Sequence, residues 1–177
     1  MSRIERALGP KRPEKPIVAC VAGGAAMQFY TGERFTDDID AKIMVRVIIA
    51  AAGNLQVAYR GRDGHARLLY FDTQYNDSYA LLHEHAYDDA LPISVEGVDP
   101  RRLEVRLLTP LDLAVSKLSR FSEQDQDDIR ALARAGLIEP DALRCRAEAA
   151  LPDYVGDLDR IRNSIGLACN FVAPEKK

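Results

Sequence analysis

The period of the apolar residues changes near residue 109 of this chain. Before that point apolar residues fall in short runs or alternate with polar residues, as they do in strands separated by turns. After it they recur at the spacing of helices. This change predicts a mixed α+β fold, in which a small sheet with helices occupies residues 1–108 and a helical region occupies residues 109–177. We expect the two parts to pack as one compact unit.

Five segments of the first part are predicted to be strands. Residues 17–22 form an apolar run rich in β-branched side chains, which is typical of a buried strand. Residues 38–45 alternate between apolar and polar side chains, which indicates a strand with one wet face. The Asp-Gly between residues 55–59 and residues 66–71 favours a hairpin. Residues 103–107 alternate again and are expected to form the last strand.

Helices are predicted in both parts, and in the second part their start signals are clear. Thr109 can act as an N-cap, with Pro110 at the first helical position and Asp112 where a capping box requires an acid. Ser122, with Asp125 three residues later, starts a second amphipathic helix. The predicted helices cover residues 3–8, 25–30, 81–91, 110–120, 122–135, 140–150 and 157–169.

The composition limits the classes of function. Apolar residues make up 47% of the 177 residues, which is enough for a packed core. The net charge of -3 gives no overall attraction to nucleic acids or anionic membranes. Binding of a polyanion would need a local basic patch, for which the candidates are Lys11, Arg12 and Lys15, or Arg60 and Arg62.

The sequence lacks the marks of a secreted, zinc-binding or membrane protein. The three cysteines, Cys20, Cys145 and Cys169, are far apart and show no CxxC spacing, which argues against a zinc site or a disulfide framework. The longest apolar stretch is too short to span a bilayer, and the charged N-terminus has no apolar core of a signal peptide. We therefore expect a cytoplasmic protein without membrane contact.

The stretch GGAAMQFYTGERFTDDID joins the first two predicted strands and carries the main candidate chemistry. Gly23 and Gly24 end the first strand, and glycine allows a bulky anion such as phosphate to approach the backbone. After thirteen further residues Asp38 and Asp40 open the next strand. Because residues at i and i+2 of a strand point to the same face, these two carboxylates can share a divalent cation. With a third carboxylate from a neighbouring strand they would form a two-metal site for nucleotidyl transfer.

This pattern resembles the signature of the nucleotidyltransferase superfamily with the DNA polymerase β-like fold. That signature is a strand, a Gly-Gly or Gly-Ser turn, a short spacer, and Asp-x-Asp on the next strand. The later stretch TPLDLAVSKLSRFSEQDQDDIRAL is similar to a motif of uncharacterised bacterial nucleotidyltransferase-like proteins. These proteins are related to toxins of abortive-infection and toxin–antitoxin pairs. The two motifs stand in the family's order, and the resemblance covers residues 17–135.

The resemblance implies roles for individual residues. Asp38 and Asp40 would bind the metal ions, which would be Mg²⁺ or Mn²⁺. Gly23 and Gly24 would hold the triphosphate of an NTP substrate. Lys117 looks like the lysine that relatives direct at the nucleotide phosphates.

The third metal-binding carboxylate has two candidates. Asp72 ends the strand that is expected beside the strand of the Asp-x-Asp motif, and Asp77 is the alternative. Asp127 and Asp128 match an acidic pair of the family, for which we expect a role in positioning their helix. We interpret Arg120 as a surface ion-pair partner.

We therefore expect a metal-dependent nucleotidyltransferase that moves an NMP from an NTP to a hydroxyl of an RNA or a protein. The closer resemblance implies an enzyme of the toxin type. The alternative hypothesis is a module that keeps the fold and binds nucleotide without catalysis, or that pairs with an antitoxin partner. A metal-dependent hydrolase that uses the same acids is a weaker hypothesis, because the glycine pair would then have no purpose.

Overall fold

The computed structural model describes residues 1–8, 13–44, 55–60, 64–72, 75 and 77–173, with the side chains of Ala7 and Asp72 left out. Val45, the last residue of one predicted strand, therefore lies outside the described residues. The same is true of three residues of the predicted basic patches, which are Lys11, Arg12 and Arg62.

The described chain forms two compact units. The first contains residues 1–26, 35–75 and 90–107, and the second contains residues 27–34, 76–89 and 108–177. The first unit carries a mixed sheet and the second is helical, so the predicted α+β fold class is confirmed. The domain limits 1–108 and 109–177 stay a prediction, and the second unit includes two segments that precede residue 108.

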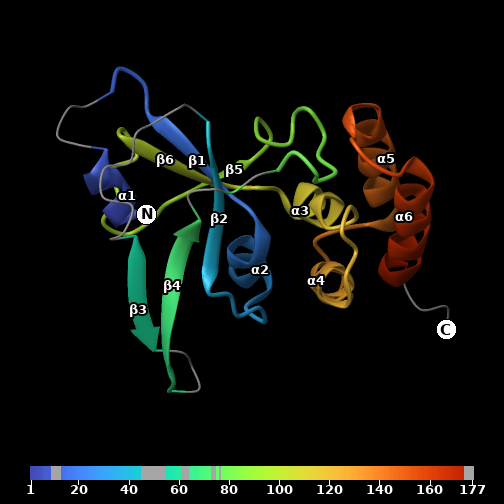
Figure 1. Cartoon of the computed structure of the whole chain (residues 1–177), viewed down its shortest axis with the longest axis horizontal. Helices are drawn as coiled ribbons and strands as arrows, with labels where there is room; N and C mark the ends of the chain where they lie inside the picture. Colours follow the sequence, from blue (N-terminus) through green and yellow to red (C-terminus); the bar gives the residue numbers. More distant parts are fainter. Residues whose placement is uncertain (9–12, 45–54, 61–63, 73–74, 76, 174–177) are drawn as a thin grey trace. The chain divides into compact units, whose positions relative to one another are not determined.

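The first unit is built on a six-stranded sheet. Its strands are β1 (Ile17–Val21), β2 (Asp38–Ile43), β3 (Gln56–Arg60), β4 (Ala66–Asp72), β5 (Leu91–Ile93) and β6 (Leu103–Leu107). Their order in the sheet is β3-β4-β2-β1-β6-β5, which can be followed in Figure 1. β1 is parallel to β6 and β2 is parallel to β4, whereas the other neighbouring pairs are antiparallel.

The core of the first unit lies along the central strands β1 and β6. Ala19 and Cys20 of β1 are fully buried, and Leu103 and Val105 of β6 are almost fully buried. This agrees with the continuous apolar run of β1, because a strand covered on both faces needs apolar side chains at every position. β3 and β4 are more exposed, and they form the predicted antiparallel hairpin, with Arg60 paired to Ala66 next to its loop.

One predicted helix is wrong. Residues 84–88 form turns within an irregular segment, and a short strand, β5, begins at Leu91, where the helix was expected to end. The His83 side chain accepts a hydrogen bond from the His85 N–H, which gives the backbone a local alternative to helical bonding. Pro92 cannot extend a helix, but an edge strand such as β5 tolerates proline.

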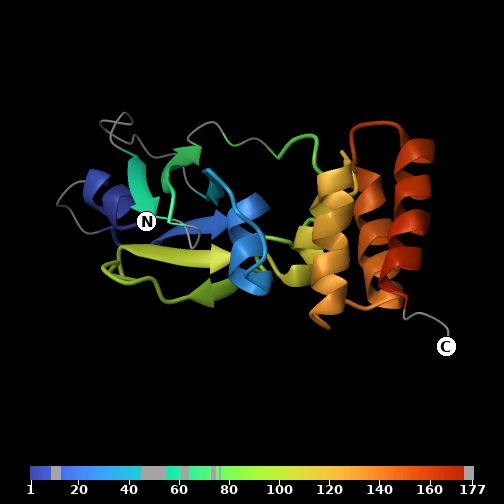
Figure 2. The same ribbon diagram turned by 90° about the horizontal axis from the view of Figure 1, so that it is seen from below.

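The remaining elements are helices. Among the described residues they are α1 (Ser2–Ala7), α2 (Gly23–Thr31), α3 (Pro110–Ser116), α4 (Glu123–Arg134), α5 (Pro140–Ala150), the 3₁₀ turn η2 (Leu151–Asp153) and α6 (Leu158–Val172). In the second unit α6 contacts both α4 and α5, and Figure 2 shows the three helices side by side. Their shared core contains the fully buried Ile129, Leu132, Leu143 and Ile161.

The helix predicted at residues 110–120 is shorter than expected. Its start is confirmed, because the Thr109 hydroxyl accepts a hydrogen bond from the Asp112 N–H at 3.0 Å. α3 nevertheless ends at Ser116, so Lys117 is its C-cap and does not lie within the helix. Phe121 then adopts a φ of 51°, in the left-handed region that breaks a helix. The predicted capping box at the start of α4 is confirmed.

Within the part of the chain that the structure describes, no helix combines the length and the apolar character that crossing a bilayer requires.

Candidate functional site

The glycine pair forms the first turn of α2, whereas the sequence predicted a turn that precedes a helix at residues 25–30. Gly23 has a φ of 55°, a conformation that side chains disfavour. A Cβ atom at Gly23 would lie 1.9 Å from Oδ2 of Asp40, and one at Gly24 would lie 2.7 Å from Oγ1 of Thr36. Both glycines are therefore required because the Asp-x-Asp segment packs directly against this turn.

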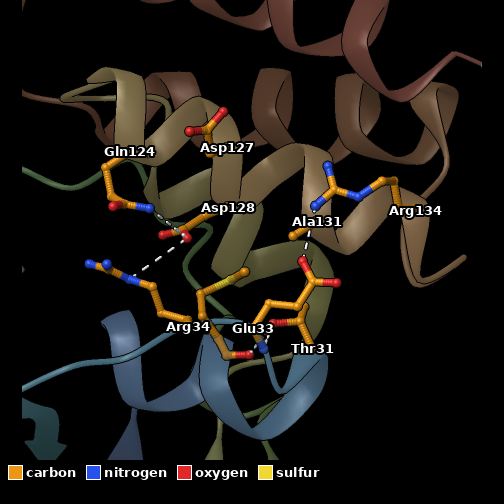
Figure 3. Close-up of a pocket in the computed structure, with 9 residues that line it drawn as sticks. Thr31, Glu33, Arg34, Gln124, Asp127, Asp128, Ala131 and Arg134 are labelled. Atoms are coloured by element: carbon orange, nitrogen blue, oxygen red, sulfur yellow. Dashed lines mark hydrogen bonds and ion pairs between the residues drawn. The ribbon is translucent and has the colours of Figure 1, made fainter. Parts of the chain in front are cut away.

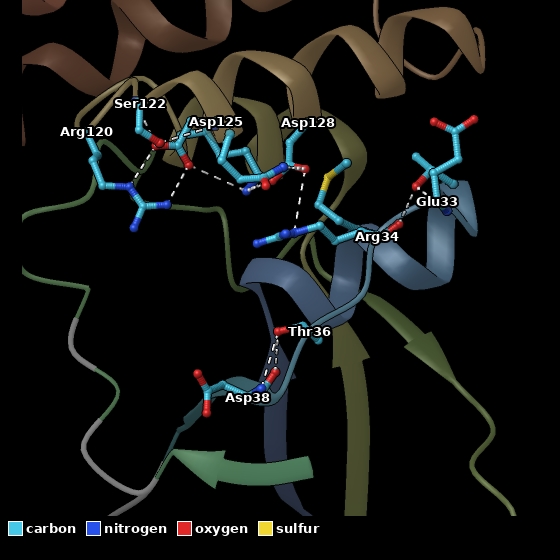
Figure 4. Close-up of polar contacts among 12 residues, drawn as sticks. Glu33, Arg34, Thr36, Asp38, Arg120, Ser122, Asp125 and Asp128 are labelled. Atoms are coloured by element: carbon cyan, nitrogen blue, oxygen red, sulfur yellow. Dashed lines mark hydrogen bonds and ion pairs between the residues drawn. The ribbon is translucent and has the colours of Figure 1, made fainter. Parts of the chain in front are cut away.

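Backbone and hydroxyl hydrogen bonds fix the Asp-x-Asp segment in place. The Ala22 N–H donates to the Asp40 carbonyl at 2.8 Å, which ties the end of β1 to β2. The Thr36 hydroxyl donates to the Asp38 carbonyl at 3.0 Å and accepts from the Asp38 N–H at 3.3 Å (Figure 4). Sequence reasoning missed Thr36, although a threonine hydroxyl can bond to the backbone two residues further on and so favour a turn.

The strand register brings the predicted acidic positions together. Asp38 pairs with Tyr70 and Asp40 pairs with Asp72 across the parallel strands β2 and β4. Asp38 is exposed and Asp40 is half-buried. Figure 4 shows the Asp38 carboxylate pointing away from Thr36. The predicted sites at Asp38, Asp40 and Asp72 therefore occupy adjacent positions on two neighbouring strands.

The alternative third carboxylate, Asp77, has a different environment. It lies in the second unit, and the Tyr87 hydroxyl donates a hydrogen bond to its carboxylate. Of the two candidates, Asp72 is the one whose backbone is in register with Asp40. Among the described side chains, no group of three His, Cys, Asp or Glu residues could hold a metal ion. The side chain of Asp72 does not belong to the described side chains. The third ligand stays a prediction.

Lys117 is buried in an ion-pair network of the second unit. Its Nζ lies 2.6 Å from Oδ2 of Asp128 and 3.8 Å from Oδ1 of Asp125. Two guanidinium groups complete the network: Arg120 donates to both Asp125 oxygens at 2.7 Å, and Nε of Arg34 lies 3.8 Å from Asp128 (Figure 4). The Lys117 ammonium group thus faces two carboxylates of the protein. Its predicted contact with the phosphates of a nucleotide stays a prediction.

The contacts of this network stabilise the ionised form of the Asp125 carboxyl. Burial alone would raise the pKa of the Asp125 carboxyl, but the hydrogen bonds from Arg120 and Ser122 and the charge of Lys117 outweigh burial. The pKa of Asp125 therefore lies below its usual value of 3.8. Asp125 is ionised at neutral pH and pairs with Lys117 and Arg120. The positioning role expected for Asp127 and Asp128 stays a prediction, and Asp128 is the one of the two that contacts the buried Lys117.

A second buried cluster joins α3 to α5. Arg146 donates to the two oxygens of Asp112 at 2.7 and 3.0 Å and to Asp89 at 2.7 Å. Asp112 is 1% exposed and also accepts from the Thr109 hydroxyl. The hydrogen bond with Asp112 raises the pKa of the Arg146 guanidinium. This cluster satisfies a buried acid and so acts as a structural clamp.

A small hollow of about 120 Å³ lies between α4 and residues 27–34 of the second unit (Figure 3). Glu33 and Arg134 form an ion pair at 3.0 Å across it, and Arg34 faces Asp128 on the other side. Asp127 lines the hollow as well, so three acids and two arginines surround it, and the hollow offers no basic excess to an anionic ligand.

Comparison with known proteins gives one finding. The model of a protein family described as "nucleotidyltransferase of unknown function (DUF6036)" matches residues 4–164, which is most of the chain. The predicted resemblance to nucleotidyltransferases is thereby confirmed, whereas the relation to toxins stays a prediction. No curated protein shows a significant match to the chain.

Proposed function

The chain belongs to this family of nucleotidyltransferases of unknown function, and on that premise we propose that it transfers an NMP from an NTP to a hydroxyl of a macromolecule. One observation carries the proposal. The carboxylate of Asp40 packs against the Gly23 turn at the start of α2, and Asp40 is in register with Asp72. The positions proposed for phosphate and for the metal ligands are thus neighbours in the sheet.

The start of α2 would bind the triphosphate. The first N–H groups of a helix have no partner within the helix, and they carry a partial positive charge that favours anions. Gly23 and Gly24 place no side chain over this turn. The space that a Cβ atom would take at either glycine is filled by the side chains of Asp40 and Thr36, so phosphate oxygens would approach the first amides of α2 from beside these two side chains.

The donor atoms fit a hard divalent cation. Asp38 and Asp40 offer carboxylate oxygens, and Asp72 is the register partner of Asp40 on β4. Oxygen ligands of this kind suit Mg²⁺ or Mn²⁺. When bound, such ions would neutralise phosphate charge and favour deprotonation of the acceptor hydroxyl.

The reaction would be a phosphoryl-type transfer without a covalent enzyme intermediate. The acceptor oxygen forms a bond to the α-phosphorus, and the bond from that phosphorus to the bridging oxygen breaks. Pyrophosphate leaves with the bonding electron pair, and a carboxylate of the site accepts the hydroxyl proton. The contribution of the chain is positioning and charge neutralisation.

A second candidate function is nucleotide binding without transfer. The engagement of Lys117 by Asp125 and Asp128 favours it over transfer, because a lysine paired in this way has less positive charge to offer to a phosphate during transfer. A toxin-type role and an antitoxin partner are supported by the resemblance of the later motif alone.

The first experiment incubates the protein with each α-labelled NTP, Mg²⁺ or Mn²⁺, and total bacterial RNA and protein. We expect label on a macromolecule, and loss of that label in Asp40→Asn. The matched control is Asp153→Asn, which removes an exposed acid of the second unit and should leave labelling unchanged.

The outcomes separate the two candidates. Metal-dependent NTP binding without label under any condition would favour the binding module. Absence of both label and NTP binding would contradict both candidates.

A further inference from the structure

A shallow hollow of about 620 Å³ lies on the β3–β4 hairpin of the first unit. Ala66, Leu68 and Tyr70 alternate along β4 and therefore point to the same face of the sheet. All three are exposed, with Leu68 at 44% and Tyr70 at 38%. Ala58 lies opposite Leu68 on β3. The small alanines leave space above the sheet, and the tyrosine ring and the leucine form an apolar border.

The hollow continues the face that carries the carboxylates. Tyr70 is the register partner of Asp38, and residues in register on neighbouring strands share one face. The strand order places β4 and β3 on one side of β2. It places β1, which leads into the Gly23 turn, on the other side.

This order determines the direction of the acceptor. In phosphoryl transfer the attacking and leaving oxygens lie roughly in line with the phosphorus. If the glycine turn on the β1 side holds the leaving pyrophosphate, the acceptor hydroxyl must come from the opposite side of β2. The hairpin with its hollow occupies that side.

Charged side chains are sorted along the hairpin. Asp37 lines the hollow, next to Asp38 of β2. His65 lines it near the hairpin loop, and the exposed Arg60 is the register partner of Ala66 beside that loop. Arg67 also lines the hollow, but it alternates with Ala66 and Leu68, and its guanidinium lies 4.8 Å from the centre of the Phe35 ring. Acidic groups therefore lie where the metal ions would bind. Arg60 pairs with Ala66, four residues along β4 from Tyr70, so the rise of a strand places it about 13 Å from the acidic end.

We propose that this hollow, bordered by Tyr70 and Leu68, binds the single-stranded end of a nucleic-acid acceptor. The proposal rests on the proposed nucleotidyl transfer. The terminal nucleoside stacks on Tyr70 and presents its hydroxyl beside Asp38. The preceding phosphates lie near Arg60 and His65, at the end of the hollow beside the loop. Aromatic stacking combined with a basic track is the usual way in which proteins bind single strands.

A polypeptide acceptor fits these features less well. An extended peptide would use the apolar border, but it carries no regular negative charge for the basic end of the hollow. A nucleic-acid strand uses both, because each nucleotide supplies a base to stack and a phosphate to neutralise. A polypeptide acceptor is therefore an outcome that the experiment must be able to reveal.

The test measures binding of a short single-stranded RNA of mixed sequence, labelled with fluorescein at its 5′ end, to the full chain by fluorescence anisotropy. We expect Tyr70→Ala to weaken RNA binding about tenfold, the effect of losing one stacked base. Tyr79→Ala is the matched control, because Tyr79 is 74% exposed and lies in the second unit. The Kd of the NTP should be unchanged in both variants.

A second pair of variants tests the charge of the hollow without removing a side chain that packs. Ala66→Glu adds a negative charge to an exposed position, and Ala66→Gln adds nearly the same volume without the charge. We expect weaker RNA binding for Ala66→Glu than for Ala66→Gln, with a difference that shrinks at high salt. This pair decides the question if Tyr70→Ala fails to fold.

Several results would overturn the proposal. Equal RNA affinity of Tyr70→Ala and Tyr79→Ala, together with equal affinity of the Ala66 pair, would do so. Labelling of a protein that depends on Tyr70, without RNA binding, would assign the hollow to a polypeptide instead.

NTP binding, compared between the natural chain and Asp40→Asn, reports separately on the proposed function. RNA binding that depends on Tyr70 in a chain that binds no NTP would retain the surface and reject the transfer. NTP binding that depends on Asp40 in a chain that binds no RNA would retain the transfer and reject the surface.

Discussion

The carboxylates of the two units have opposite environments. In the second unit Asp112, Asp125 and Asp128 are at most 4% exposed, and each faces an arginine or lysine within 2.7 Å. In the first unit Asp38 is exposed, and among the described residues no basic side chain forms an ion pair with it. The same residue type is thus neutralised by the protein in one unit and accessible to solvent in the other.

The physical reason is the cost of burying charge. A buried carboxylate is tolerated only with a charged or hydrogen-bonding partner, so the acids of the second unit stabilise helix starts and helix contacts. An exposed carboxylate needs no such partner and remains available to a ligand. The comparison therefore predicts that acids of the second unit govern stability and that acids of the first unit govern activity.

The largest expected effect is on the free energy of unfolding of Asp128→Ala. Removal of Asp128 leaves the buried Lys117 ammonium without its closest partner, which should cost about 3–5 kcal/mol. Urea denaturation measures the loss. The control Asp127→Ala, at an exposed ion pair, should cost less than about 1 kcal/mol. Adding Lys117→Met to Asp128→Ala should restore stability, and equal losses for the two aspartates would refute the comparison.

The next largest effect concerns the glycine turn. Gly23→Ala would force a side chain into the left-handed region and against the Asp40 carboxylate, at a cost of about 2–3 kcal/mol. Gly32→Ala is a matched control, because Gly32 has a φ of 68° but nothing within 4 Å of an added Cβ. It should show the backbone cost alone, about 1 kcal/mol. Similar losses in urea denaturation would mean that Asp40 does not require Gly23.

A smaller effect should follow pH. Because the pKa of Asp125 is lower in the folded chain than its usual 3.8, its contribution to stability is complete above pH 3.8. It is lost as pH falls through the lower, folded pKa. Asp125→Asn should cost about 1.5 kcal/mol at neutral pH, from weakened charge-assisted hydrogen bonds. Its urea midpoints should fall less steeply below pH 4 than those of the natural chain; parallel profiles would assign the acid sensitivity to other groups.

The smallest stability effect is expected at Asp38. Asp38→Asn should change the free energy of unfolding by no more than about 0.5 kcal/mol, because the side chain is exposed. The same substitution should abolish nucleotidyl transfer. A thermal melt combined with the labelling assay measures both. A large loss of stability with retained transfer would reverse the roles that the comparison assigns to the two units.

The local features of the fold were predictable, because they depend on residues close together in the chain. The Thr109 cap and the Ser122–Asp125 capping box each involve groups three residues apart. The hairpin was indicated by its own Asp-Gly loop. Turn bonding at His83 overrode the helix expected from residues 81–91, since a side chain can compete with the backbone for the same N–H groups.

The candidate site was predictable only in part. The glycine pair and Asp38 and Asp40 were found from their spacing, and the structure shows the contact that makes Gly23 necessary. The environment of Lys117 was not predictable, because its partner Asp128 belongs to another helix and the two meet only after the chain turns at Phe121.

The α+β fold class, most strands and helix starts, and the family could be predicted from the sequence, since periodicity, caps and motif spacing depend on local residue order. Which charges are paired could be learned from the folded chain alone. Asp40 lies beside Asp72 because β2 and β4 run parallel in one register, although the two residues are far apart in the chain. Register and packing depend on the whole sheet, and the electrostatic role of each aspartate follows from the groups that packing brings near it.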